Sequence, residues 1–169
     1  MELNVSTLLQ EPVGSTREYK FDDAADIIGD GNPYRVQGDC RLLRTGRGIL
    51  VKCLLDSEME LTCGRCLRQF RYPLKISFEE EFLPTVDVTS GMPLPQTDDA
   101  GAFTIDELNI MDLVEPARQY ALTTIPMKPL CQTDCAGLCP QCGKNLNLGN
   151  CGCPTEEIDP RWSELTKLL

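Results

Sequence analysis

The chain has 169 residues, of which 26 are acidic and 16 basic, so its formal net charge at pH 7 is −10. It contains ten cysteines and no histidine, which excludes Ser-His-Asp and Cys-His catalytic sites as well as metal sites with imidazole ligands. The acidic balance argues against a polycationic nucleic-acid-binding protein, provided that the charge is evenly spread along the chain.

The N-terminal segment and the hydropathy of the chain indicate a soluble, cytoplasmic protein. The sequence begins MELNV, with neither the basic nor the apolar region of a secretory signal. It holds no run of about 18 apolar residues, so we expect no membrane span. Because cytosolic thiols stay reduced, clustered cysteines favour a metal site over disulfides.

The first 31 residues predict two strands and one ambiguous segment. Residues 3–9 partly alternate between apolar and polar side chains and predict a strand. Residues 17–21 predict a second strand, after a turn at 12–15. Residues 22–31 could begin a short helix, which the sequence GDGNP would end.

Strand patterns become clear from residue 34 onward. Residues 34–43 and 49–55 predict a hairpin around a loop at 45–48, and a short strand at 58–62 follows. The next strand has apolar side chains at every second position, which is the best strand pattern in the chain. These side chains are Phe70, Tyr72, Leu74, Ile76 and Phe78, within a predicted strand over 70–82. The result is an antiparallel meander, with a CGRC sequence at one of its turns.

The remaining elements are shorter. Residues 84–101 have little to bury and predict a mobile loop, and residues 103–105 and 108–110 predict strands that resume the sheet. Asp112 and Glu115 form a capping-box pattern, which predicts a helix to about residue 124. Its inward side chains are expected to be Leu113, Ala117 and Tyr120 or Ala121. The pair Asp159-Pro160 predicts the start of a short C-terminal helix.

These elements predict an α+β fold, mainly an antiparallel β meander or partial barrel, with one or two short helices and a small zinc-binding C-terminal module. We expect a β-rich core at 1–83 and an acidic mobile loop at 84–102. A strand–helix segment at 103–130 completes the core, and a cysteine-rich zinc module with a C-terminal helix occupies 131–169.

Six cysteines lie close together near the end of the chain: Cys131, Cys135, Cys139, Cys142, Cys151 and Cys153. The sequence CPQCG at 139–143 is typical of a zinc knuckle, since two thiolates at this spacing bind one ion and glycine permits the tight turn. The turn-rich residues 144–150 cannot build a core. We therefore predict a structural metal site here rather than a disulfide knot or loose thiols.

The choice of ligands leaves alternatives open. Cys139 and Cys142 are the safest pair, and the simplest second pair is Cys151 with Cys153, although a CxC spacing strains joint ligation. The substitutes for this second pair are Cys131 and Cys135. Four of these six thiolates would close a tetrahedral zinc site with no open position, which makes the site structural rather than catalytic.

A second CxxC pair, Cys63 and Cys66, leaves three interpretations open. Together with the six tail cysteines it gives eight thiols, which suffice for two four-cysteine zinc sites, one of them linking the sheet to the tail. The pair could instead remain reduced, or could form a redox pair. We therefore expect one structural zinc ion and allow for two.

Two other groups of residues are expected to be structural. Cys40 and Cys53 occur singly in strand patterns and predict ordinary core thiols. The carboxylates of Glu79, Glu80 and Glu81 predict a solvated strand end rather than a catalytic pair. The sequence shows no phosphate-binding glycine loop and no nucleophile elbow, so we expect a non-enzymatic protein without a small-molecule substrate.

The charge is unevenly distributed. Residues 79–115 contain ten acidic residues and no Lys or Arg, so the rest of the chain has 16 residues of each sign and is neutral. Residues 35–75 contain nine basic and four acidic residues, a local charge of +5. This cluster predicts either a solvated sheet face or an RNA-facing patch. Its candidate contacts are Arg65, Arg68, Arg71, Arg44 and Arg47.

Four landmarks in this order resemble the YceD family, also called large ribosomal RNA subunit accumulation proteins. They are LTCGRCL at 61–67, FEEEF at 78–82, DLVE at 112–115, and the tail from PLC at 129–131 through GLCPQCGKNLN at 137–147, CGC at 151–153 and DPR at 159–161. The tail resembles the cysteine-rich, metal-binding form of the family. The resemblance implies a role in accumulation of 23S rRNA and in large-subunit assembly.

The partner implied by this resemblance is a pre-ribosomal large subunit, 23S rRNA or a large-subunit ribosomal protein. Two alternatives remain. One is a zinc-dependent adaptor whose tail binds a protein. The other is a thiol redox protein that uses Cys63 and Cys66, which is weaker because the pair lies between strands and not at a helix N-terminus, where a thiolate is stabilised.

Overall fold

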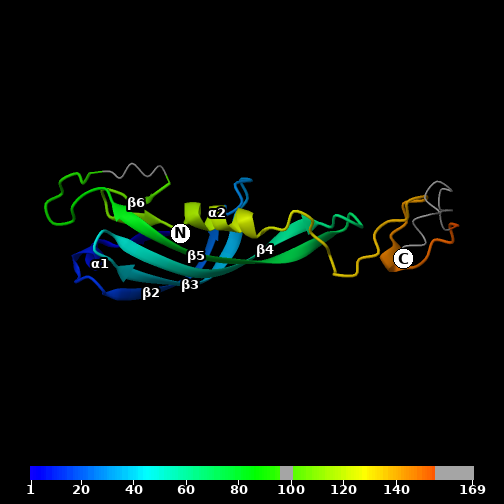
Figure 1. Ribbon diagram of the computed structural model, residues 1–169, viewed down its shortest axis with the longest axis horizontal. Coiled ribbons are helices and arrows are strands. Elements are labelled where there is room, and N and C mark those ends of the chain that lie inside the picture. The colour runs from blue at the N-terminus through cyan, green and yellow to red at the C-terminus, as the bar shows by residue number, and fades with distance from the viewer. Residues whose placement is uncertain (96–100, 155–169) are drawn as a thin grey trace, which may run out of the picture. The chain divides into compact units, whose positions relative to one another are not determined.

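The computed structural model describes residues 1–95 and 101–154 (Figure 1). It contains two compact units, which we describe separately. Unit 1 comprises Met1–Leu61 and Phe70–Pro129, and unit 2 comprises Thr62–Gln69 and the chain from Leu130 onward. The predicted division into four segments differs from these units in its boundaries and stays a prediction.

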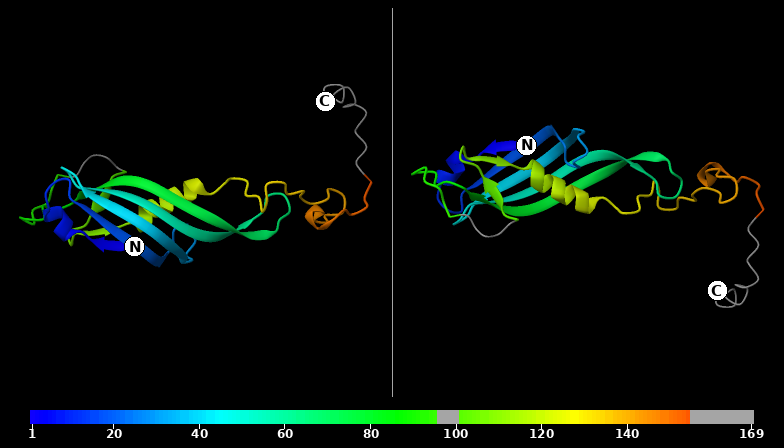
Figure 2. Two further views of the ribbon diagram at one scale, coloured as in Figure 1. Left: turned by 90° about the horizontal axis from the view of Figure 1, so that it is seen from below. Right: turned by 90° about the horizontal axis from the view of Figure 1, so that it is seen from above.

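Unit 1 is built on a seven-stranded sheet that curls around two short helices (Figure 2). In space the strands follow the order β1-β7-β6-β5-β4-β3-β2. Their bounds are β1 Glu2–Asn4, β2 Thr16–Ala25, β3 Tyr34–Arg44, β4 Ile49–Thr62, β5 Gln69–Pro84, β6 Phe103–Ile105 and β7 Ile110–Asp112. The pairs β1–β7, β2–β3, β3–β4 and β6–β7 are antiparallel, and β5–β6 is parallel. The predicted α+β fold with a mainly antiparallel sheet is confirmed.

The long strands confirm the period-two pattern. In β5, Leu74, Ile76 and Phe78 are buried and the side chains between them are exposed, as a sheet with one covered face requires. The helix α2 (Val114–Thr124) lies against this sheet (Figure 1) and buries Ala117 and Ala121. These side chains belong to one hydrophobic core.

The prediction of a single strand over residues 3–9 is wrong beyond Asn4. The chain forms β1 and then the helix α1 (Ser6–Gln10). The Asn4 side chain accepts hydrogen bonds from the backbone N–H and the hydroxyl of Ser6. This gives a partner to one of the backbone N–H groups that have none within the first turn of the helix. Val5, Leu8 and Leu9 are buried at helical spacing.

A helix at 22–31, one of the possibilities left open, does not form. Strand β2 continues to Ala25, and a loop follows in which the Asp26 carboxylate accepts four backbone hydrogen bonds, from Ile28, Gly29, Asp30 and Gly31. A carboxylate that binds nearby backbone N–H groups competes with a helix. These hydrogen bonds also lower the pKa of Asp26, the largest effect coming from Gly29.

The elements after β5 are close to those predicted. Strand β6 forms at the expected residues, but β7 begins at Ile110, two residues later than the predicted strand at 108–110. The Asp106 side chain accepts hydrogen bonds from the backbone of Leu108 and Ile110 and holds these residues in a turn, in which Asn109 has a φ of +59°.

Helix α2 ends where predicted and its inward residues are confirmed, but the predicted capping box does not form, because the N-cap is Leu113 and Glu115 instead accepts hydrogen bonds from Arg118 and Gln119. The carboxylate of Asp112 accepts a hydrogen bond from the backbone of Val114, and Leu113, Ala117 and Ala121 are buried. The ring of Tyr120 stacks on Phe78 at 5.6 Å.

The described residues include only part of the predicted mobile loop and none of the predicted C-terminal helix. Residues 84–95 include a bridge between Val86 and Pro93 and a turn held by the Asp87 carboxylate. The mobility of the loop stays a prediction, and the helix expected after Asp159 lies outside the described residues. Within residues 1–95 and 101–154, no helix is long and apolar enough to cross a membrane.

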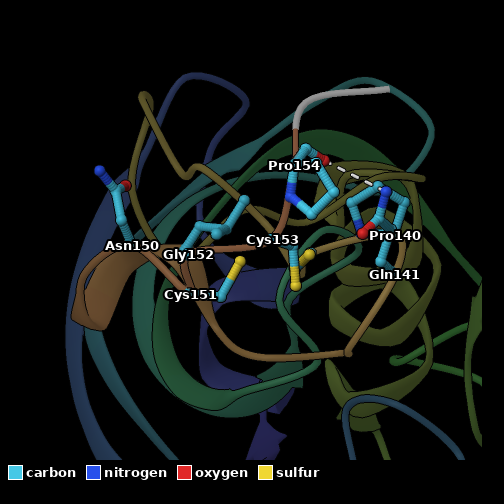
Figure 3. A pocket seen from close by; sticks show the side chains of 9 residues that line it. Pro140, Gln141, Asn150, Cys151, Gly152, Cys153 and Pro154 are labelled. Carbon is cyan, nitrogen blue, oxygen red and sulfur yellow. Dashed lines mark hydrogen bonds between the residues drawn. The ribbon is translucent and has the colours of Figure 1, made fainter. Parts of the chain in front are cut away.

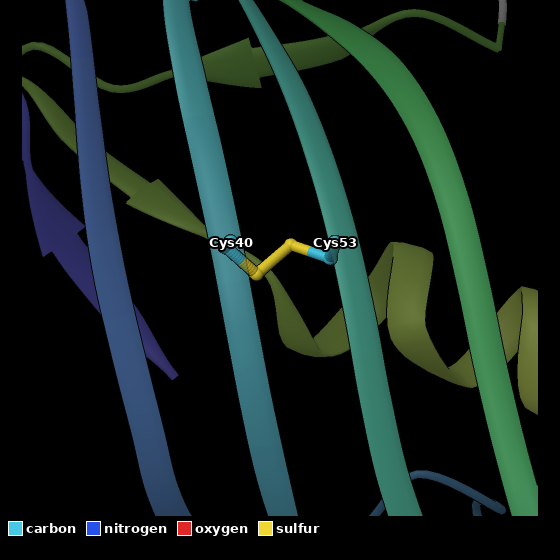
Figure 4. The surroundings of a disulfide bond; sticks show 2 residues. All are labelled: Cys40 and Cys53. Atoms are coloured by element: carbon cyan, nitrogen blue, oxygen red, sulfur yellow. A yellow bond between two sulfur atoms is a disulfide. The ribbon is translucent and has the colours of Figure 1, made fainter.

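The prediction that Cys40 and Cys53 are ordinary core thiols is wrong, because the two form a disulfide (Figure 4). Both are buried, as expected, but they also lie directly opposite each other in the β3–β4 register, with their Cα atoms 4.1 Å apart. The expectation that all thiols stay reduced therefore fails for this pair.

Candidate metal centres

Unit 2 brings all of its eight described cysteines together in two groups of four. Within each group, the sulfur atoms all lie within 4.8 Å of one another. Cluster 1 consists of Cys63, Cys66, Cys131 and Cys135. Cluster 2 consists of Cys139, Cys142, Cys151 and Cys153. The eight thiols are free of disulfides.

Cluster 1 begins in the turn between β4 and β5. The backbone N–H of Cys63 donates to the Arg68 carbonyl at 2.9 Å, and that of Leu67 donates to the Cys63 carbonyl at 3.0 Å. To close this turn, Leu67 adopts a φ of +57°, a conformation that favours glycine. The turn directs Cys63 and Cys66 to the same point.

Cluster 2 begins in a turn of the same geometry. The backbone N–H of Cys139 donates to the Lys144 carbonyl at 2.8 Å, and that of Gly143 donates to the Cys139 carbonyl at 2.9 Å. Gly143 has a φ of +73°. The sequences CGRCLR and CPQCGK therefore form equivalent knuckles, in which Leu67 and Gly143 have the same role.

The spacing of the sulfurs in cluster 1 fits a tetrahedral zinc ion. The sulfurs of Cys63 and Cys135 are 3.8 Å apart, and those of Cys66 and Cys131 are 3.6 Å apart. Four thiolates at a Zn–S distance of about 2.3 Å lie about 3.8 Å from one another in a tetrahedron. Three of the four cysteines are buried and Cys131 is partly buried. Cluster 1 therefore has the shape and burial of a closed structural site.

Two residues outside the thiol set support cluster 1. The guanidinium of Arg65 donates to the Cys135 carbonyl at 2.9 Å, which ties the knuckle to the second pair of cysteines. Gly137 has a φ of +77°, and a Cβ atom there would lie 3.3 Å from the Arg65 carbonyl. This role of Arg65 could not be inferred from the sequence, because its partner lies 70 residues away along the chain.

Cluster 2 is local in sequence and more open. Its second pair, Cys151 and Cys153, is only partly buried, and Cys142 is exposed. A hollow of about 500 Å³ lies beside Cys151 and Cys153 (Figure 3). The Gln141 side chain donates to the Pro154 carbonyl across this hollow at 3.2 Å. Cluster 2 is therefore more open to solvent at Cys142, Cys151 and Cys153 than at Cys139, which is buried.

The pKa values of the thiols differ within each cluster. Hydrogen bonds from backbone N–H groups, first those of Cys66 and Cys142, lower the pKa of Cys63 and of Cys139 to about 6. The pKa of Cys131 is raised to about 12, chiefly by burial. The backbone of each knuckle thus favours a thiolate at its first cysteine, which is the form that binds a metal ion.

In cluster 2 the thiol with a raised pKa is that of Cys153, at about 12. The main cause is hydrogen bonding with the Cys142 sulfur, followed by that with Cys151. Burial raises the pKa of Cys135 in cluster 1, but hydrogen bonds to its sulfur from the Asn147 side chain and the Gly137 backbone bring it below the ordinary value. Asn147 was not identified from the sequence.

The candidate RNA-contact arginines do not form one patch. The side chain of Arg44 donates to the carbonyls of Leu9, Thr45 and Gly48 and is thereby occupied. Arg47 pairs with Glu81 on β5. Because Arg71 lies ten residues from Glu81 on the same strand, about 33 Å separate these two positions.

Acidic residues from outside the basic window offset part of its charge. Arg35 pairs with Asp22 at 2.8 Å and Lys52 with Glu79 at 3.1 Å, and neither acid lies within residues 35–75. A sum over one sequence window misses acids that neighbouring strands supply. Of the remaining candidates, Arg65 supports cluster 1, and the exposed Arg68 makes no side-chain hydrogen bond or ion pair within the described residues.

Comparison with known proteins identifies relatives in bacteria. The Mycobacterium tuberculosis protein described as uncharacterized protein Rv2926c is 32% identical over 131 residues, which cover 78% of this chain and 60% of that protein. The Mycobacterium leprae protein ML1660, also described as uncharacterized, is 27% identical over 85% of this chain and 62% of its own length. The chain thus spans about three fifths of the length of these relatives.

A third relative matches at full length. The Bacillus subtilis protein described as uncharacterized protein YlbN is 28% identical, over 100% of this chain and 96% of that protein. No solved structure matches the chain. The family described as "Large ribosomal RNA subunit accumulation protein YceD" matches residues 51–169, a region that includes every cysteine of both clusters. The chain therefore belongs to the YceD family.

Proposed function

We propose that this protein is a non-enzymatic factor for accumulation of 23S rRNA and assembly of the large ribosomal subunit in the cytoplasm. The observation that carries the proposal is the family match over residues 51–169, since the family is described by accumulation of large-subunit ribosomal RNA. The matched region contains the whole of unit 2. Unit 2 is therefore the part of the chain to test first.

We propose further that each cluster holds one structural zinc ion. The chain has no histidine, and the eight sulfurs form two groups of tetrahedral size, which suits zinc with four cysteine ligands. Such an ion would supply folding energy and no reaction chemistry, since four thiolates leave no open position. In this proposal the cysteines hold the ions, and the knuckle backbones orient the sulfurs.

The proposed partner is argued from the candidate arginines that are exposed to solvent. Arg68 is exposed in unit 2. Arg71 is exposed on β5, and its only ion pair among the described residues is a long one of 4.0 Å with the exposed Glu58. We therefore propose these two arginines for contact with 23S rRNA or a pre-ribosomal large subunit. A zinc-dependent adaptor that binds a large-subunit ribosomal protein is the second candidate. It is favoured by the ion pairs of Arg35 and Lys52, which reduce the basic charge available to RNA.

The experiment is depletion of the protein in its source cell, followed by measurement of the ratio of 23S to 16S rRNA and of large-subunit precursors in sucrose gradients. We expect depletion to lower the ratio and the wild-type chain to restore it. A normal ratio after complete depletion would contradict the proposed role in accumulation. The Cys139→Ser/Cys142→Ser variant should fail to restore the ratio if the metal sites are needed.

The two partner candidates give different results with charge reversal. The variant Arg68→Glu/Arg71→Glu should lose co-sedimentation with large-subunit precursors if RNA contact is direct, and Lys20→Glu, an exposed position on β2, is the matched control. Unchanged association of the double variant would discard these arginines and support the adaptor. Loss of association with Lys20→Glu as well would show a nonspecific effect of charge.

A further inference from the structure

Asn147 connects the two cysteine clusters. It lies in the 3₁₀ turn Leu146–Leu148, between Cys142 and Cys151, and so belongs by sequence to the loop of cluster 2. Its side-chain amide nevertheless donates to the sulfur of Cys135 in cluster 1, at 3.3 Å. Asn147 thus belongs to the loop between the two cysteine pairs of cluster 2 and also contacts a cysteine of cluster 1.

The amide of Asn147 uses its full hydrogen-bonding capacity in this position. Its nitrogen donates to the Cys135 sulfur and to the Asn145 side-chain oxygen at 2.7 Å. Its oxygen accepts from the backbone N–H of Ala136 at 2.8 Å and from the Gln132 side chain at 3.2 Å. Two donors and two acceptor positions are all that an asparagine side chain has. The Ala136 N–H fixes which end of the amide faces the sulfur.

The backbone that carries Asn147 is held by the knuckle of cluster 2. The N–H of Cys139 binds the Lys144 carbonyl, and the N–H of Leu146 binds the Gly137 carbonyl at 2.9 Å. A bridge between Leu138 and Asn145 continues this pairing. The position of the Asn147 amide therefore depends on the closed form of residues 139–153, which four thiolates of cluster 2 would fix around an ion.

We infer that Asn147 couples the two metal sites, so that an ion in cluster 2 strengthens binding of an ion in cluster 1. The inference rests on the proposed metal binding. An ion in cluster 2 fixes the loop that presents the amide, and the amide then donates to the Cys135 thiolate bound to the ion in cluster 1. Partners of this kind orient and stabilise a ligand, and their loss typically lowers metal affinity 10–100-fold. Linkage makes the coupling reciprocal.

The test is a titration of the full-length, metal-free chain with Co²⁺, followed by the absorption bands of tetrahedral thiolate-bound cobalt. A Cys139→Ser/Cys142→Ser variant leaves cluster 1 alone, and a Cys63→Ser/Cys66→Ser variant leaves cluster 2 alone. In the chain with both clusters intact, we expect Asn147→Ala to lower the affinity of cluster 1 about tenfold. The matched control is Asn150→Ala, which removes an exposed side chain of the same loop and should leave the affinity unchanged.

Combining the variants separates coupling from independent damage. If Asn147 transmits the effect of cluster 2, removing cluster 2 should weaken cluster 1 by a similar factor, and adding Asn147→Ala to that variant should cause little further loss. If the two changes lower the Co²⁺ affinity of cluster 1 by factors that multiply, the coupling is overturned. It is also overturned if the Asn147→Ala chain binds Co²⁺ as tightly as the Asn150→Ala chain. If the wild-type chain takes up no cobalt, the proposal of metal sites fails as well.

A second variant and a spectroscopic signal exclude a merely structural role for the side chain. Asn147→Asp keeps the size and the oxygen that accepts from Ala136, but replaces the donor to the Cys135 sulfur by an oxygen. With ¹¹³Cd²⁺ in both sites, we expect Asn147→Asp to shift the resonance of cluster 1 and leave that of cluster 2 in place. Resonances that both stay unchanged would overturn the inference.

Discussion

The two units of this protein are stabilised in different ways. Unit 1 has a continuous hydrophobic core, drawn from its curled sheet and both helices, and one disulfide. Among the described residues of unit 2, the only buried apolar side chains are those of four cysteines: Cys63, Cys66, Cys135 and Cys139. A small region with so little apolar surface to bury requires a metal or a covalent link to fold.

The comparison indicates which unit would depend on the proposed metal ions for its folding. In unit 1 the free energy of folding comes from side chains that the chain itself supplies, so this unit needs no ion. In unit 2 the proposed ions would supply this contribution through ion–thiolate bonds, because the buried side chains are thiols. Cluster 1 adds a second effect, since the ion proposed there would join Cys66 to Cys131 across 65 residues of sequence.

The largest expected effect is the unfolding of unit 2 when metal is removed. A strong chelator should abolish the amide hydrogen-exchange protection of residues 62–69 and 130–154 and leave that of the core strands of unit 1 intact, because only unit 2 lacks an apolar core. Exchange followed by mass spectrometry measures both regions in one sample. Parallel loss of protection in β3 and β4 would show that the two units are not independent.

Single substitutions should separate the two clusters of unit 2. We expect Cys66→Ser to release protection from both of its chain segments, whereas Cys142→Ser should abolish protection only in residues 139–154, since the ligands of cluster 2 all lie within 139–153, and should merely lower that of residues 62–69 and 130–138. Metal analysis at saturating zinc should give one ion per chain for each variant and two for the wild type. Equal and complete loss of protection in both variants would show that neither cluster folds without the other.

The sequence was sufficient where local pattern decides the structure. The alternation of Leu74, Ile76 and Phe78 identified β5 because a pleated strand with one buried face imposes a period of two. The prediction of a strand over residues 3–9 failed, because Val5, Leu8 and Leu9 match helical spacing and the Asn4 side chain accepts a hydrogen bond from the backbone N–H of Ser6, the first residue of the helix. At such short lengths periodicity does not distinguish a helix from a strand.

Long-range pairing was harder to predict than local structure. The hairpin loop at 45–48 was identified correctly, and Cys40 and Cys53 each lie four residues from its closing pair, Arg44 and Ile49, so the register of the hairpin would have placed them opposite each other. No comparable local signal pairs Cys63 with Cys135, because their contact depends on how two distant segments meet. The CxxC spacings identified both knuckles, whereas the second half of cluster 1 was reached only as one alternative, through the count of eight thiols for two sites.

The disulfide of unit 1 provides a third test of the comparison. Reduction should destabilise unit 1 by about 3 kcal/mol, the value expected for a bridge that closes a loop of this length, and should not unfold it, since the apolar core remains. A thiol titration in denaturant and chelator should give eight thiols per chain before reduction and ten after it. Ten thiols before reduction would show that Cys40 and Cys53 are not joined.

The smallest effect concerns the two equivalent knuckles of unit 2. Leu67 has a φ of +57° and its side chain is 65% exposed, so Leu67→Gly removes backbone strain and gives up little packing. We expect a gain of about 1 kcal/mol, somewhat offset by the greater freedom of the unfolded chain. Gly143→Leu is the reverse change, because a Cβ at Gly143 meets no atom within 4 Å and only the positive φ opposes it.

Chelator competition for cobalt measures both variants on one scale. Leu67→Gly should retain metal up to about fivefold more tightly at cluster 1, and Gly143→Leu should retain it less tightly at cluster 2 by a similar or larger factor. If Leu67→Gly instead weakens cluster 1, the exposed leucine makes a contact that the knuckle needs. The equivalence of the two turns would then extend to their backbone hydrogen bonds but not to their energetics.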